Sequence, residues 1–131
     1  MDTATDEEEQ VVKRRVLVVD DHPDTARSYY ELLHSMGHDC RFTTDAYQAL
    51  PIARQLRPQL ALLDIGLKID LDGFDLAKAL RAEFGHEVTL IAITAYGRDE
   101  DRHRTRKAGF DAHVTKPIDI GLLESILRSR M

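Results

Sequence analysis

The chain has 131 residues, of which 43% are hydrophobic and 31% charged, and these values fit one compact domain with a single core. Its formal net charge of −5 argues against direct binding to nucleic acid, because such binding depends on clustered Lys and Arg side chains. No apolar run approaches the roughly 20 residues that cross a bilayer, and the acidic first residues do not resemble a secretory signal. The single cysteine cannot form an internal disulfide. We therefore expect a cytoplasmic protein without a membrane partner.

Residues 1–13 are acidic and lack apolar periodicity, which predicts a disordered tail before one domain of residues 14–131. Beyond the tail, short apolar runs alternate with segments of helical spacing. Three runs are β-branched or aliphatic throughout, as is typical of strands buried on both faces of a parallel sheet. These runs are Val16–Val19, Leu60–Leu63 and Val88–Ile93. Two weaker runs, Asp39–Thr43 and Phe110–Thr115, predict edge strands.

The first two helical segments carry boundary signals. Pro23 sits where proline is favoured in a first turn, and Gly37 sits where glycine ends a helix. The second segment follows Asp45 and contains Pro51. Because an interior proline costs about 3 kcal/mol, we expect a kink there or a helix that begins only at about Leu50.

The remaining helical segments differ in the apolar surface that they offer. The third follows Asp72, a suitable N-cap. The fourth, about Asp99–Lys107, contains no large apolar residue, so little burial holds it in place. The last has five apolar residues on one face: Ile118, Leu122, Leu123, Ile126 and Leu127. Five strand–helix units in strict alternation predict a doubly wound α/β sandwich.

Polar residues close four of the predicted strands. Asp20 and Asp21 follow the first strand, Asp64 the third, Thr94 the fourth and Lys116 the fifth. Because the carboxyl ends of parallel strands meet at one edge of a sheet, we expect these side chains to converge there. Two charges 4 Å apart repel by about 4 kcal/mol at an effective dielectric constant of 20, so a divalent cation would be needed besides the lysine. Carboxylate oxygens of this kind favour Mg²⁺.

Four segments resemble the signatures of response-regulator receiver domains of two-component signalling, in the same order and at the same separations. They are VLVVDD, LALLDIGL, IAITAYG and GFDAHVTKP. The resemblance covers about Arg14 to Met131. It implies the fold of the chemotaxis response regulator, a flavodoxin-like (βα)5 sandwich whose parallel strands follow the order 2-1-3-4-5.

The resemblance also implies the chemistry of the strand-end residues. Asp64 would accept a phosphoryl group from a phosphohistidine on a histidine kinase or histidine phosphotransfer protein. Mg²⁺ would bind between Asp20, Asp21, Asp64 and the backbone carbonyl of Gly66. Such a transfer needs charge neutralisation and positioning more than covalent help, and a carboxylate nucleophile gives a labile acyl phosphate that suits a resettable signal.

The response to phosphate is implied in the same way. Thr94 would hydrogen-bond the phosphoryl group, and Lys116, followed by a cis bond to Pro117, would pair with it. His113 stands where the family usually has Tyr or Phe, which swings inward as the threonine moves. The imidazole is smaller and can carry charge, and the loop DIGLKIDLDG after Asp64 is one residue longer than the common pattern. An unknown downstream protein would bind the face of the fourth helix, fifth strand and last helix.

Other titratable residues have simpler interpretations. His34 and His38 are four apart, but Gly37 separates them, so we expect both to be solvated rather than to bind metal. Cys40 is expected to be a small buried hydrophobe. The arginines of the fourth helical segment are expected to form a solvated face.

Three alternatives to a switch stay open at this point. The domain could pass its phosphate to another histidine as a relay intermediate or phosphate sink. It could be the receiver piece of a hybrid histidine kinase. From another class, it could be an Asp-nucleophile phosphohydrolase, although haloacid-dehalogenase-like enzymes need a second Asp two residues after the nucleophile, and Gly66 occupies that position.

Tyr96 lies two residues after Thr94, at a position that influences the rate of phosphate loss in the family. We predict that Tyr96→Ala changes the rate of autodephosphorylation, because the side chain controls access of water to the acyl phosphate. Decay of the phosphorylated protein measured by intact mass tests this, and equal rates for the two proteins would contradict it.

Overall fold

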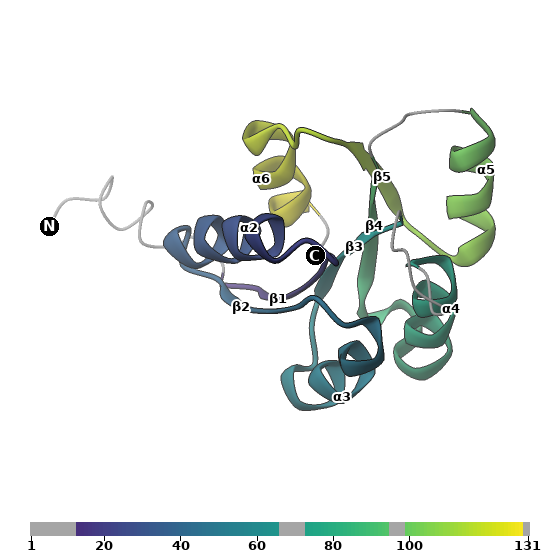
Figure 1. Ribbon diagram of the computed structural model, residues 1–131, viewed down its shortest axis with the longest axis horizontal. Coiled ribbons are helices and arrows are strands. Elements are labelled where there is room, and N and C mark those ends of the chain that lie inside the picture. Colours follow the sequence, from purple (N-terminus) through teal and green to yellow (C-terminus); the bar gives the residue numbers. More distant parts are fainter. Residues whose placement is uncertain (1–12, 66–72, 95–98, 130–131) are drawn as a thin grey trace, which may run out of the picture.

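The computed structural model of the chain describes residues 13–65, 73–94 and 99–129. Five strands form one parallel sheet: β1 Arg15–Val19, β2 Asp39–Thr43, β3 Leu60–Asp64, β4 Thr89–Thr94 and β5 Ala112–Thr115. Their order in the sheet is β2-β1-β3-β4-β5 (Figure 1). The predicted strand order and the edge positions of β2 and β5 are therefore confirmed.

Helices cover both faces of this sheet (Figure 1). On one face, α2 Pro23–Ser35 and α6 Ile120–Ser129 pack on a core that includes Val16 and Val18. On the other face, α3 Ala46–Leu56, α4 Gly73–Phe84 and α5 Asp99–Ala108 pack on a core that includes Leu17 and Val19. A short 3-10 helix, η1 Gly85–Glu87, leads from α4 to β4. Successive side chains of a strand point to opposite faces, so each central strand contributes to both cores.

The first helix has the boundaries that its sequence predicted. α2 begins at Pro23, whose missing N–H is not needed in a first turn. At its end, Gly37 adopts a φ of 93°, and the N–H of His38 donates to the carbonyl of Leu33 at 3.1 Å. This is the Schellman arrangement, which glycine adopts without the steric penalty of a side chain.

The predicted late start of the second helix is wrong, because α3 begins at Ala46 and continues through Pro51. Asp45 caps the helix by accepting a hydrogen bond from the N–H of Tyr47 at 3.0 Å. Four residues on its inner face are buried: Ala46, Ala49, Ala53 and Leu56. Capping and apolar burial together offset the cost of an interior proline.

The last two helices differ in how they attach to the sheet. In the described part of α5, Thr105 and Ala108 are buried, and the guanidinium of Arg104 lies 4.1 Å from the ring centroid of Phe74. In α6, Leu123 and Leu127 are buried, whereas Leu122 is 46% exposed, so the predicted apolar face of this helix is wrong at that residue. Leu122 is about 100° around the helix from Leu123 and falls outside the contact stripe.

His38 contradicts the expectation that it is solvated. It is 5% exposed, and its Nδ1 accepts a hydrogen bond from the backbone N–H of Arg14 at 3.0 Å. The guanidinium of Arg14 in turn donates to the carbonyl of Leu127 at 3.1 Å. These bonds join the entry of β1, the turn before β2 and the end of α6. His34 is exposed as expected, and Cys40 is buried as expected.

No helix in the described ranges is long and apolar enough to cross a membrane. The expected N-cap Asp72 and the tail of residues 1–12 lie outside the described residues.

We predict that protonation of His38 destabilises the fold. Burial, with a smaller contribution from Arg14, lowers the pKa of His38 below its usual value of 6.5. The unfolded chain therefore binds more protons than the folded chain, and stability should fall as pH drops below about 6.5 towards the folded-state pKa. His38→Asn keeps an acceptor near Nδ1 but does not titrate, so the stability difference between wild type and variant should shrink over this interval in urea titrations. The exposed His86 offers the control His86→Asn, and an equal pH response of the two variants would contradict the assignment.

Candidate functional site

The register of the sheet brings the strand-end residues to one edge. Val19 pairs with Leu63, so Asp20 follows β1 at the level of Asp64 at the end of β3. Asp64 pairs with Ile93, which puts Thr94 one residue further along β4. Thr94 pairs with Thr115, the residue before Lys116. The predicted convergence of these residues at the carboxyl edge is thus built into the strand pairing.

Lys116 connects the two buried carboxylates. Its Nζ lies 3.2 Å from Asp64 Oδ2 and 3.4 Å from Asp20 Oδ2. The side chains of Asp20 and Asp64 are only 1% and 5% exposed, respectively. Partial burial acts to lower the pKa of Lys116, but the carboxylates of Asp64 and Asp20 outweigh it and raise that pKa above its usual value. The ammonium is therefore charged at neutral pH and compensates part of the negative charge.

The backbone around Lys116 positions this residue at the edge of the sheet. The N–H of Lys116 donates to the carbonyl of Thr94 at 2.7 Å, which extends the pairing of β4 and β5 by one step. The Lys116–Pro117 bond is cis, as the family resemblance implied. Thr94 is buried at this edge.

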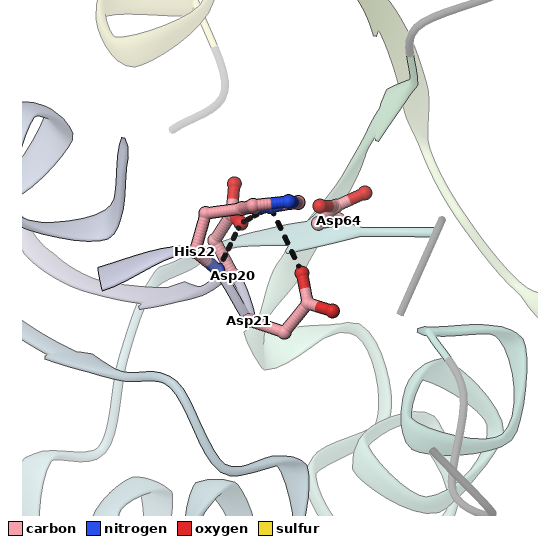
Figure 2. Close-up of side chains that lie close together, drawn as sticks. All are labelled: Asp20, Asp21, His22 and Asp64. Carbon is pink, nitrogen blue, oxygen red and sulfur yellow. Dashed lines mark hydrogen bonds and ion pairs between the residues drawn. The ribbon is translucent and has the colours of Figure 1, made fainter. Parts of the chain in front are cut away.

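Sequence reasoning overlooked His22 as part of the site. Its Nδ1 lies 3.1 Å from Asp20 Oδ1 and 3.0 Å from Asp21 Oδ1, and Figure 2 shows the ring beside these carboxylates, near Asp64. The backbone N–H of His22 also donates to Asp20 Oδ1 at 3.0 Å. The available signal was its position directly after two site carboxylates, which fixes it at the sheet edge.

Gly73 is a second residue whose role was missed. It is the first residue of α4, and a Cβ placed on it would lie 2.6 Å from the carbonyl oxygen of Asp64 and 2.8 Å from the Cα of Ile65. Both neighbours are backbone atoms that cannot move aside cheaply. Only glycine allows α4 to start against the end of β3 in this way.

Tyr29 of α2 also lies near this region. Burial raises the pKa of its phenol, and the charges of Lys116, Asp20 and Asp64 act on it as well. Tyr29 packs against the core on the α2 side of the sheet.

The other predicted site residues are placed as follows. His113 is partly buried in β5 and pairs with Ala92. Its neighbours Ala112 and Val114 belong to the core under α2 and α6, so its side chain projects from the opposite face. Gly66 and Tyr96 lie outside the described residues.

The donor set fits a divalent cation. One ligand atom each from Asp20, Asp21, His22 and Asp64 can be chosen so that all lie within 4.8 Å of one another. Three ionised carboxylates and one ammonium leave two negative charges, which one divalent cation would neutralise. Most of the donors are carboxylate oxygens, the ligands that hard cations such as Mg²⁺ prefer.

Comparison with known proteins now identifies the family. Residues 16–128 match the response regulator receiver domain. The chain belongs to this family. A polar-differentiation response regulator, DivK of Brucella anthropi, is 31% identical over 109 residues, covering 82% of this chain and 87% of DivK.

Two further relatives show the range of receiver contexts. The DNA-binding response regulator MtrA of Mycolicibacterium smegmatis is 35% identical over 120 residues, which cover 92% of this chain but 51% of MtrA, so the chain spans about half of that protein. The crystal structure of a CheY-like receiver domain protein from Methanospirillum hungatei superposes with a TM-score of 0.80 at 28% identity, covering 91% of this chain and 97% of that one. The likeness extends over nearly the whole receiver domain.

We predict that Gly73→Ala destabilises the protein although alanine is the better helix former. The new methyl group must displace the backbone of Asp64 and Ile65, and such overpacking costs about 1–3 kcal/mol, against a gain of about 1 kcal/mol in helix propensity. Urea unfolding measures the difference. Gly121→Ala in α6 is the control, because its nearest neighbour is the Asp119 side chain at 3.2 Å, and an equal effect of both changes would contradict the close-approach argument.

Proposed function

We propose that this receiver domain accepts a phosphoryl group on Asp64 from the phosphohistidine of a histidine kinase or histidine phosphotransfer protein, in a reaction that requires Mg²⁺. An oxygen of Asp64 would attack phosphorus while the bond from phosphorus to the imidazole nitrogen breaks, and the imidazole would leave with the electron pair. The observation that carries the proposal is the pairing of a buried Asp64 with Lys116 at 3.2 Å, beside two further carboxylates. A nucleophile, a fixed cation and a cation site are the parts that phosphoryl transfer needs.

The residues around Asp64 would have three different functions: charge neutralisation, metal binding and hydrogen bonding to the phosphoryl group. Lys116 holds a positive charge against the incoming phosphoryl oxygens and keeps the aspartate oriented. Asp20, Asp21 and Asp64, with the carbonyl of Gly66, would hold Mg²⁺. When bound, the ion supplies charge neutralisation for the transferring group. Thr94, buried at the end of β4, would hydrogen-bond the product phosphate.

The proposed output is a change in a protein-binding surface. Thr94 and His113 lie on the paired strands β4 and β5, and α5 packs beside them on the α4 side of the sheet. Phosphate at Asp64 would favour one of two arrangements of α5, β5 and α6. The free energy of this shift equals the difference between the phosphate's interaction energies in the two arrangements. A downstream protein in the cytoplasm would bind one arrangement more tightly.

We propose that this activity is a switch rather than enzymatic turnover. A relay intermediate or phosphate sink would use the same site, as would the receiver piece of a hybrid histidine kinase. Phosphohydrolase activity is disfavoured because Gly66 stands where such enzymes carry a second Asp.

We predict that wild-type protein incubated with Mg²⁺ and acetyl phosphate gains one phosphoryl group that is stable in acid and labile in base. Asp64→Asn should not gain it, since the amide is not a nucleophile. Intact mass spectrometry measures the modification. Asp39→Asn is the control, because this exposed carboxylate lies at the other end of the sheet and its loss should leave phosphorylation unchanged. Phosphorylation of Asp64→Asn, or steady hydrolysis of a generic phosphomonoester by wild type, would overturn the proposal.

A further inference from the structure

Arg81, in the last turn of α4, joins this helix to two other segments of the chain. Its Nη1 donates to the carbonyls of Gly85 and Val88, which lie just before β4. Its Nε and Nη2 both donate to the carbonyl of Gly109, at 3.2 and 2.7 Å, and Nη2 also donates to Asp111 Oδ2 at 2.7 Å. A guanidinium has five N–H donors, so each of them has an acceptor here. The side chain is only 17% exposed, which shields these bonds from water.

The turn between α5 and β5, residues 109–111, is also bound to β4. The backbone N–H of Asp111 donates to the carbonyl of Leu90 at 2.8 Å, and the N–H of Leu90 donates to Asp111 Oδ2 at 2.8 Å. Gly109 adopts a φ of 99°, and the N–H of Phe110 donates to the carbonyl of Thr105 at 3.0 Å, which ends the helix in a Schellman arrangement. The C-terminal end of α5 is therefore held by α4 and β4 together.

The first half of α5 has a different composition. Its residues Asp99–His103 are all charged or polar, whereas the buried residues Thr105 and Ala108 belong to the second half. The chain leaves β4 at the carboxyl edge of the sheet, so α5 begins at that edge and runs back towards the start of β4. Buried contacts determine how firmly a segment is held. The half of α5 that begins at the edge of the phosphoacceptor site thus has the sequence of a weakly held segment.

We propose that Arg81 fixes the C-terminal end of α5, so that phosphorylation of Asp64 tilts this helix about Gly109 instead of shifting it as a whole. Glycine suits a pivot because it accepts changes of φ and ψ that other residues resist. The proposal rests on the proposed function, which supplies the phosphoryl group and makes α5 part of the output surface. Arg81 is a positioning residue, since its hydrogen bonds go to residues outside the phosphoacceptor site. A downstream protein would then distinguish the two states by the first half of α5.

Nitrogen-15 NMR of wild-type protein, Arg81→Lys and Arg54→Lys, each before and after treatment with Mg²⁺ and acetyl phosphate, tests the tilt. In wild type, the amide shifts caused by phosphorylation should be several-fold larger over residues 99–104 than over residues 108–111. In Arg81→Lys the two sets should become similar, because one ammonium cannot replace a planar fork that binds acceptors on two sides. Arg54→Lys is the matched control and should keep the wild-type pattern, since Arg54 also binds α4, through Glu83 at 2.8 Å, but joins it to α3.

Amide hydrogen exchange of the unphosphorylated proteins tests the anchor by itself. Arg81→Lys should speed exchange over residues 109–111 several-fold more than in β3, because local release opens the turn without opening the central strand. A purely structural role would speed both alike. Asp111→Asn is a second variant in case lysine prevents folding: it removes the charged acceptor, leaves the carbonyl acceptors of Arg81 in place, and should change exchange and shifts in the same direction.

The outcomes separate this proposal from the proposed function. The tilt is overturned if wild type shows equal phosphorylation shifts over residues 99–104 and 108–111, or if the wild-type pattern persists in Arg81→Lys and in Asp111→Asn. The anchor is overturned if exchange in the turn and in β3 rises equally. If wild type gains no phosphoryl group, the proposed function and the tilt fall together, whereas selectively faster exchange of the turn in Arg81→Lys would still uphold the anchor.

Discussion

Two buried carboxylates that share one ammonium are the constraint around which this domain is arranged. The ammonium of Lys116 lies 3.4 Å from Asp20 and 3.2 Å from Asp64, and it offsets the strong repulsion between like charges in a low-dielectric site. Lys116 in turn comes from the far end of the chain and arrives through the pairing of β4 with β5. The register of the parallel sheet therefore determines which charged side chains lie next to one another.

Helices on both faces of the sheet pack near this charge cluster. On one side, Tyr29 of α2 packs on the core, and the charges of Lys116, Asp20 and Asp64 act on its phenol. On the other, α4 begins against the backbone of Asp64. Both cores are packed with aliphatic side chains, so the carboxylates sit at the boundary between a rigid interior and the solvent.

The sequence predicted the sheet and the convergence of Asp20, Asp64 and Lys116 at its edge because their signals are local or recurrent: continuous apolar runs, polar strand ends and four family signatures. It failed where long-range contacts decide the outcome. Pro51 is tolerated because burial along α3 outweighs its cost. His38 is buried because Arg14, 24 residues earlier, donates to its ring. The contributions of His22 and Gly73 depend on ångström-scale approaches, which spacing alone does not encode.

The start of α4 connects the backbone of Asp64 with α5, the helix proposed for output. A Cβ on Gly73 would lie 2.6 Å from the carbonyl oxygen of Asp64, so the backbone passes close to it. The next residue, Phe74, lies beneath the guanidinium of Arg104 in α5. A single peptide unit thus separates the contact with β3 from the contact with α5. Any reorientation of the backbone at Asp64 that tilts the first turn of α4 would also move the aromatic surface on which α5 rests, giving the domain a mechanical connection that bypasses β4 and β5.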